Sequence, residues 1–300
     1  MTDAPKRADW NREYGDAADH MGLQLINAYS PRIDEVAAKQ NGEYMAVIED
    51  RSSLQLDDRY VGAWRGASLS AMSMGAALDS LQTLRALVLE AKVIPMTGLY
   101  PTLRAVVENA ALAVYLLAPR ERDERLRRTY RVAADETRLR RVFELEIASR
   151  KVVTSERVQA TKDAKEKSDR IHAELIGMVS MRPSLGDPAK FTFPRVHFST
   201  LVSIASDVLD ADPSLDEIGS EMSLLAMWQL LSGLSHGKQW AMVAVLERTR
   251  AIVNERNCSA HVRLTTSPAV IAVFLERALQ TLECAYRLYG RRSKAAWAEP

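Results

Sequence analysis

The chain has only two cysteines among its 300 residues, Cys258 and Cys284. They form neither a CxxC pair nor a spacing typical of metal ligands. Two isolated thiols in a chain of this length suit a reducing compartment, although the sequence alone leaves a disulfide between them open. The sequence also lacks a P-loop, a GxGxxG turn, an HExxH helix and the Glu-x-x-His pairs of a di-iron bundle. We therefore expect no metal and no nucleotide cofactor.

No apolar run reaches the roughly 18 uninterrupted residues of a membrane span. The segment Leu99–Ala118 comes closest, but Arg104, Glu108 and Asn109 interrupt it. The first nine residues contain no apolar stretch of the kind found in secretory leaders. These features predict no membrane partner and a cytoplasmic location.

An excess of charge of either sign is also missing, because the formal net charge is +1. The whole chain is therefore not drawn electrostatically to nucleic acid or to membranes. Charge is nevertheless uneven along the sequence. Residues 1–60 hold 7 basic and 12 acidic side chains, whereas residues 120–170 hold 16 and 11. This asymmetry suits intramolecular docking, dimerisation or a local anionic ligand.

Glycine and aromatic residues are few, and β-branched residues rarely alternate with period two. Apolar residues instead recur every three or four positions, which predicts an all-α protein. We expect one antiparallel helical bundle over residues 1–300 with a long charge-rich helical arm. Its predicted parts are an acidic N-terminal region (1–66), core helices (67–119), the arm (120–181) and C-terminal core helices (189–290).

The periodicity also predicts individual elements. The expected helices cover 67–92, 99–118, two long segments within 120–181, 198–210, 214–235, 240–252 and, most clearly, 268–290. Ser267-Pro268 supplies an N-cap with proline at the first helical position, and Gly290 is expected to end that last helix. Segment 251–266 has mild β character and is compatible with a short hairpin.

Arg104 and Glu108 form a polar island in an apolar helix. At a spacing of four residues they share one helix face, and Tyr115 continues that stripe. One interpretation is an ion pair that fixes the register of neighbouring helices. The other is that Arg104 holds an anion, because a guanidinium binds carboxylate or phosphate through two parallel hydrogen bonds.

A second polar island, Ser232-Gly-Leu-Ser-His-Gly237, ends another apolar run. His236 lies on the face of Gln229 and Ser232, and Trp228 and Trp240 flank the turn. One interpretation is helix capping, with a cationic His236 at the negative helix end and Gly237 just beyond it. The functional interpretation joins His236 to Arg104 and Glu108 in one polar cleft.

Two further patterns suggest other chemistry. The segment Gly233-Leu-Ser-His-Gly237 matches the G-x-S-x-G elbow of serine hydrolases, with Ser235 as nucleophile, although the preceding residues suit a helix better than a strand. Residues 120–141 hold nine arginines and five acids, a stripe that could follow a phosphate backbone. Because the acids are interspersed, a solvated or dimer-facing helix is the simpler interpretation.

The motifs Arg104-Ala105…Glu108, Leu116-Leu-Ala-Pro119 and Ser232-Gly-Leu-Ser-His-Gly237 with Trp240 resemble those of uncharacterised, largely actinobacterial helical proteins. More remotely, such proteins resemble HEPN-like bundles, many of which dimerise and cleave RNA. That nuclease pattern places an arginine five to seven positions before the histidine, but residues 229–231 here are Gln-Leu-Leu. The nuclease motif is therefore not intact, and the resemblance implies a HEPN-like fold more than catalysis. A separate hypothesis is that Arg104 substitutes for the missing arginine from another helix.

Two functions remain in competition. In the first, a cleft binds an anionic ligand such as RNA, with His236, Arg104 and Glu108 as catalytic residues. The remaining expected ligand contacts are Ser232, Gln229, Tyr115 and Trp240. In the second, the protein is a non-enzymatic, dimeric interaction module whose polar residues serve helix packing.

Overall fold

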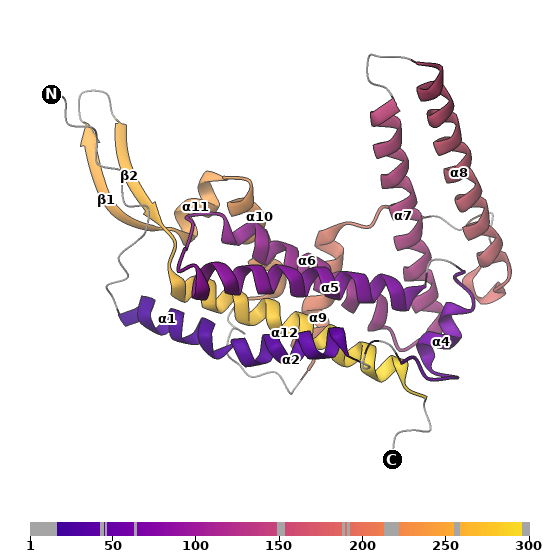
Figure 1. Cartoon of the computed structure of the whole chain (residues 1–300), viewed down its shortest axis with the longest axis horizontal. Coiled ribbons are helices and arrows are strands. Elements are labelled where there is room, and N and C mark those ends of the chain that lie inside the picture. Colours follow the sequence, from indigo (N-terminus) through magenta and orange to yellow (C-terminus); the bar gives the residue numbers. More distant parts are fainter. Residues whose placement is uncertain are drawn as a thin grey trace.

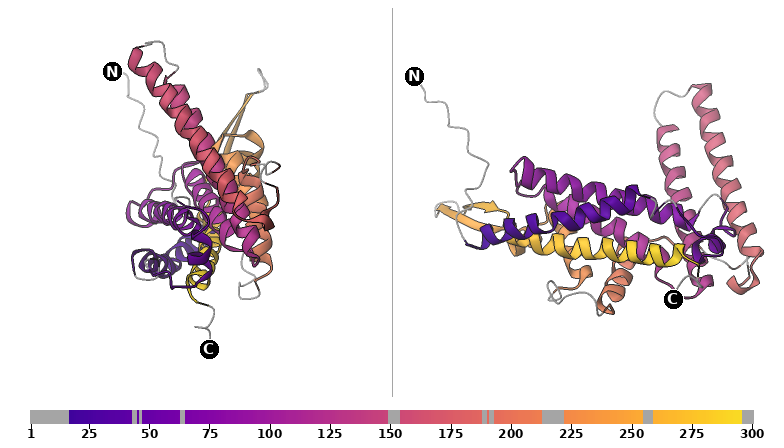
Figure 2. Two further views of the ribbon diagram at one scale, coloured as in Figure 1. Left: turned by 90° about the vertical axis from the view of Figure 1, so that its right-hand side faces the viewer. Right: turned by 60° about the horizontal axis from the view of Figure 1, so that its bottom comes forward.

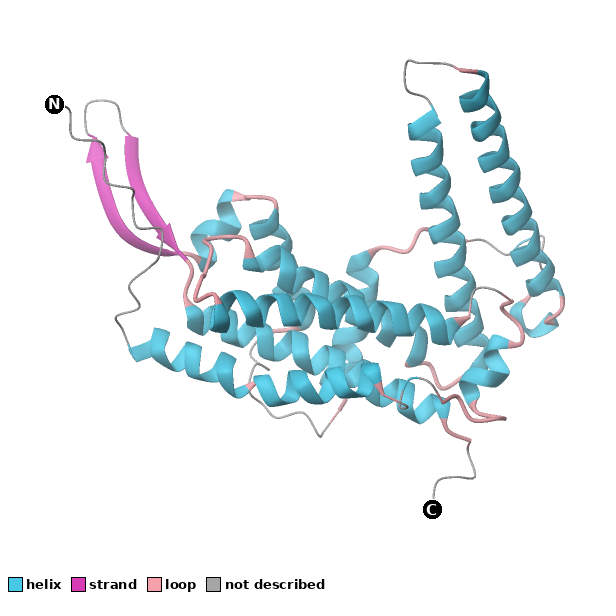
Figure 3. Ribbon diagram, in the orientation of Figure 1, coloured by secondary structure: helices cyan, strands magenta, loops and turns pink. Residues whose placement is uncertain are grey.

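The computed structural model describes residues 17–42, 45, 47–62, 65–148, 154–187, 190, 193–212, 222–254 and 259–295. A body of packed helices carries two projections, a helical arm at one end and a β-hairpin at the other (Figures 1 and 3). The fold is all-α apart from this hairpin, as the periodicity predicted. Among the described helices, none combines the length and apolar character needed to cross a membrane.

Three helices form the centre of the body. They are α5 (Gly66–Arg85, continued by the π-helical turn η1, Ala86–Glu90), α6 (Leu99–Leu117) and α12 (Pro268–Ser293). Helix α6 packs against both of the others, and most of its residues are fully buried. On one side α12 is covered by α1 (Ala17–Ala28) and α2 (Ser30–Asn41). On another side α6 is covered by α9 (Phe198–Asp210) and α10 (Leu224–Ser235).

The predicted arm is present as a pair of long helices, α7 (Arg122–Ala148) and α8 (Ser155–Ser180), which project away from the body (Figures 1 and 2). The arm is anchored at its base by a second, smaller core that includes Leu126, Tyr130 and Leu175. The short 3₁₀ turn η2 (Pro183–Leu185) follows α8. Farther out, both helices lead away from the body (Figure 2), and large apolar side chains of α7 such as Phe143 are exposed.

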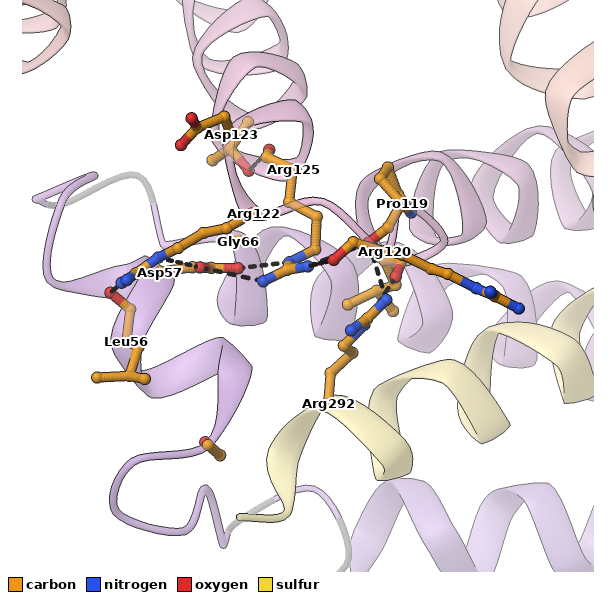
Figure 4. Close-up of polar contacts among 12 residues, drawn as sticks. Leu56, Asp57, Gly66, Pro119, Arg120, Arg122, Asp123, Arg125 and Arg292 are labelled. Carbon is orange, nitrogen blue, oxygen red and sulfur yellow. Dashed lines mark hydrogen bonds and ion pairs between the residues drawn. The ribbon is translucent and has the colours of Figure 1, made fainter. Parts of the chain in front are cut away.

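The charge asymmetry is used, at least in part, for intramolecular docking (Figure 4). Asp57, in the short helix α4 (Ser53–Asp58), accepts from Arg122 Nε at 3.0 Å and from Arg125 Nε at 2.6 Å. Arg125 also donates to the carbonyls of Pro119 and Arg120, at 3.1 and 2.7 Å. The acidic N-terminal region and the basic start of the arm are thereby joined at one buried carboxylate.

Two boundaries differ from the prediction. The helix expected over 240–252 ends early, as α11 (Gln239–Val245), because the chain enters strand β1 (Glu247–Asn254). Strand β1 pairs antiparallel with β2 (Ser259–Thr265), so the hairpin starts before residue 251 and takes the backbone hydrogen bonds that a helix would have used. Likewise α12 continues past Gly290 to Ser293, whose hydroxyl donates to the Gly290 carbonyl at 3.1 Å.

Other predicted boundaries hold to differing degrees. Helix α9 has the predicted limits, and α10 begins at Leu224 rather than at 214, while residues 213–221 lie outside the described part of the chain. The predicted helix 67–92 corresponds to α5 with η1. Cys284 is buried and Cys258 lies outside the described residues, so the question of a disulfide stays a prediction.

The carboxyl group of Asp58, at the end of α4, couples stability to pH. Burial raises its pKa from 3.8 to about 6, while backbone N–H groups of Ala67 and Gly66 offset part of this rise. Because the folded protein binds this proton more tightly than the unfolded chain, the stabilisation is complete below pH 3.8 and is lost as the pH rises through about 6. Asp58→Asn should therefore raise the melting temperature above pH 6 and have little effect near pH 4. Thermal melts of both proteins across this range test it; a pH-independent difference would contradict it.

Candidate functional site

The two polar islands of the sequence meet in the folded protein. Helix α10 packs against α6, and Arg104 Nη1 lies 3.1 Å from His236 Nε2, although the residues are 132 positions apart. The predicted proximity of these two side chains is therefore correct. It depends on α6 and α10 being neighbouring helices, which the local sequence pattern of each could not establish.

Helix α6 positions Arg104 at the edge of the core. Its neighbours Leu103, Val106 and Val107 are fully buried, so the opposite face carries the polar pair. Arg104 Nε donates to Glu108 Oε1 at 2.7 Å, as their spacing of four residues predicted. The two side chains are 23% and 14% exposed, which places them on the rim of the bundle and not in its centre.

Trp228 completes the cluster from α10. Its Nε1 donates to the same Glu108 Oε1 at 2.9 Å, and the Arg104 Cζ lies 5.9 Å from the centre of its ring. The sequence identified Trp228 only as a residue near the turn. A signal was present, since positions 228, 232 and 236 follow one another at intervals of four on one helix face.

The contact between Arg104 and His236 has one possible direction. A guanidinium has no acceptor, so in a hydrogen bond between them Arg104 Nη1 donates and His236 Nε2 accepts. His236 is also the C-cap residue of α10, the position that the capping interpretation gave it. Gly237, at φ +61°, follows it and donates through its N–H to the Leu234 carbonyl.

The other expected ligand contacts are distributed differently. Ser232 is half-buried on the Trp228 and His236 face, whereas Gln229 is exposed. Tyr115 is not part of the cluster, because eleven residues of helix separate it from Arg104 by about 16 Å. Its ring lies instead against Arg128 of α7, whose Cζ is 4.6 Å from the ring centre.

The close packing of α11 on α10 requires a glycine at position 233. A Cβ at Gly233 would lie 2.6 Å from the Ala241 Cβ and 2.9 Å from the Trp240 ring, so glycine allows α11 to approach α10. Trp240 therefore covers α10 at this point, while much of its ring surface stays exposed. This packing accounts for the first glycine of the G-x-S-x-G match.

The surroundings of Ser235 are not those of a hydrolase nucleophile. Residues 224–235 form a helix where the elbow requires a strand and a sharp turn. The Ser235 hydroxyl donates to the Leu231 carbonyl at 2.7 Å, within the same helix. The match to the serine hydrolase pattern is thus explained by helix packing and capping.

Over the described part of the chain, no group of three or more His, Cys, Asp and Glu side chains is placed to hold a metal ion. Comparison with known protein families, with curated proteins and with solved structures finds no match to this chain. The candidate site is a cluster of Arg104, Glu108, Trp228 and His236. It is identified by its geometry alone.

Proposed function

We propose that Arg104 and His236 bind an anionic group, namely a phosphate of RNA or of a nucleotide. The observation that carries this proposal is the contact between Arg104 Nη1 and an exposed histidine at the edge of the bundle. Glu108 orients the guanidinium through Nε, and in the described part of the chain no protein atom accepts from Nη2. A rigidly held guanidinium with free donors is the group that best recognises phosphate.

Binding of a phosphate would give Arg104 a new hydrogen-bond acceptor. A phosphate oxygen would replace His236 Nε2 as the acceptor for Arg104, because an anion is the stronger partner of a guanidinium. Released from Arg104, His236 would carry its proton on Nε2 and donate to the same phosphate. RNA cleavage would require this step as well, since Nε2 cannot act as an acid while it accepts from Arg104.

The HEPN-like resemblance supports the same ligand class. Those nucleases pair an arginine with a histidine, and here Arg104 of α6 stands beside His236 where residues 229–231 supply no arginine. An RNA ligand also agrees with the cytoplasmic location expected from the sequence. Arg104 would thus take the role of the arginine that HEPN-like nucleases carry before their histidine.

A packing role is the second candidate, and one observation favours it. Glu108 Oε1 accepts from both Arg104 and Trp228, so a single carboxylate connects α6 to α10. In that case Arg104→Ala would leave the partly buried Glu108 carboxylate without its cationic partner. The free energy of unfolding would fall by as much as about 3–5 kcal/mol. His236→Ala would then change neither stability nor any binding.

Calorimetric titration of the full chain with short single-stranded RNAs and with nucleotides tests the proposal. Arg104→Ala and His236→Ala should each raise the dissociation constant by about tenfold or more, because each removes a charge-assisted hydrogen bond. His236→Ala should leave the melting temperature unchanged, and electrophoresis of the same RNAs shows whether binding leads to cleavage.

Arg85→Ala is the matched control for Arg104→Ala. Arg85 is 24% exposed, close to the 23% of Arg104, and is likewise paired to a carboxylate, that of Asp34 at 2.5 Å. It should leave binding unchanged. Equal losses in both arginine variants, or no binding by the wild-type protein, would contradict the proposed function.

A further inference from the structure

The turn between α10 and α11 exposes three side chains within five positions, here called the turn face. They are His236, Lys238 and Trp240, and all three are exposed. Trp240 is 56% exposed, and a ring of this size gains free energy when it is covered. Among the described residues, no side chain pairs with Lys238. The turn thus presents an uncommitted cation between an exposed imidazole and an exposed aromatic ring.

The Trp240 ring is held in place along one edge. A Cβ at Gly233 would lie 2.9 Å from Trp240 Cζ2 and 3.4 Å from Trp240 Cε2, so this edge of the ring lies against α10. The Lys238 N–H donates to the Gly233 carbonyl at 2.8 Å, which folds the turn back over the end of the same helix. His236 follows Gly233 by three positions, about one helical turn. The ring, the lysine and the histidine are therefore close enough for one ligand to contact all three.

The surroundings of the turn face favour an anion. Residues 222–246 contain no aspartate and no glutamate. Glu108 of α6 reaches this region, but its Oε1 already accepts from Arg104 and from Trp228. Arg104 in turn contacts His236, which joins the turn face to the phosphate site proposed above. An anion bound by Arg104 therefore has a second cation and an aromatic ring beside it.

Cations beside an exposed aromatic ring match the chemistry of one nucleotide in a single strand. Aromatic side chains stack on unpaired bases of any sequence, while basic side chains bind the phosphates of the strand. A duplex does not offer this combination, because each base is stacked on its neighbours inside the helix. Inorganic phosphate would use the cations of the turn face and leave the Trp240 ring uncovered.

We infer that the ligand of this site is a single-stranded segment of RNA, with an unpaired base stacked on Trp240 and a neighbouring phosphate bound by Lys238. The inference rests on the proposed function, since Arg104 and His236 hold the first phosphate. It adds a preference for unpaired nucleotides, which phosphate contacts by themselves do not provide.

Calorimetric titration of the full chain with a short single-stranded RNA, and with the same ribose-phosphate strand lacking its bases, tests the stacking. Trp240→Ala should raise the dissociation constant for the normal strand by about tenfold, the effect of losing one stacked base. It should leave the dissociation constant for the abasic strand unchanged, and Trp240→Phe should retain most of the affinity. Equal losses on the two strands would show that the ring acts only through the fold, which would overturn the inference.

Phe143→Ala is the matched control for Trp240→Ala. Phe143 is also a strongly exposed aromatic residue, at 64%, but belongs to α7, whose arm lies away from α11 (Figure 1). It should leave RNA binding unchanged. Arg104→Ala separates the inference from the proposed function, because it should weaken binding of both strands. A loss with Arg104→Ala but none with Trp240→Ala would overturn the stacking alone, whereas no loss with Arg104→Ala would contradict the proposed function itself.

The salt dependence of RNA binding tests Lys238. Lys238→Ala should reduce the slope of log affinity against log salt concentration by roughly 0.7, the contribution of one phosphate contact on a single strand. An unchanged slope would contradict the phosphate contact. Double-stranded RNA of the same sequence should bind the wild-type protein more weakly than the single strand, and Trp240→Ala should remove this difference. A duplex bound as tightly as the single strand would also overturn the inference.

Discussion

Asp57→Ala is expected to lower the free energy of unfolding by about 3–5 kcal/mol. The Asp57 carboxylate is 10% exposed and is the acceptor shared by Arg122 and Arg125. Removing it leaves the guanidinium of Arg125, only 7% exposed, without its counter-charge between α4 and the start of the arm. An uncompensated buried charge costs more than the original pair contributed, which explains the size of the effect.

Urea unfolding followed by circular dichroism measures this loss. Asp34→Ala is the matched control, because Asp34 is also paired to an arginine, Arg85, but is 65% exposed. Exposed pairs of this kind contribute roughly 0–1 kcal/mol. Similar losses in the two variants would show that the Asp57 cluster does not connect the arm to the body as the structure indicates.

Leu282→Ala is expected to cost about 2–5 kcal/mol. Leu282 is fully buried in α12, the helix that contacts α1, α5 and α6. Shortening it removes buried apolar surface and leaves a cavity that three packed helices can close only in part. Because alanine is a good helix former, the loss reports packing and not helix propensity.

Val273→Ala, in the same helix, is the control for Leu282→Ala. Val273 is 46% exposed, so its truncation should change stability by less than about 1 kcal/mol. Denaturation of both variants under identical conditions makes the comparison. A cost at position 273 equal to that at position 282 would mean that α12 does not occupy the centre of the body.

The candidate site shows what local spacing can predict. The bond between Arg104 and Glu108 follows from their separation by one helical turn and was predicted correctly. Tyr115 lies on the same side of α6 but about three turns farther along it, so its expected role as a ligand contact stays a prediction. The guanidinium of Arg128, on the neighbouring helix α7, lies over the Tyr115 ring.

The hairpin and the end of α12 show where local signals compete. Residues 247–252 had enough helical periodicity to be predicted as helix, yet they pair with 259–265 as strands. Gly290 was predicted to end α12, but the helix continues to Ser293 because burial among neighbouring helices outweighs the low helix propensity of one glycine.

The amino-acid sequence by itself determined the helical class, the long charged arm, the position of α9 and the buried face of α12. These depend on residues three or four positions apart, whose side chains meet in any helix. Tertiary structure alone decided that Arg104 meets His236, that Asp57 binds Arg125 across 68 positions and that Gly22 lies against the backbone of Ala269. The reason is that such contacts depend on which helices become neighbours, and this is settled by the packing of the whole apolar core and not by any one segment.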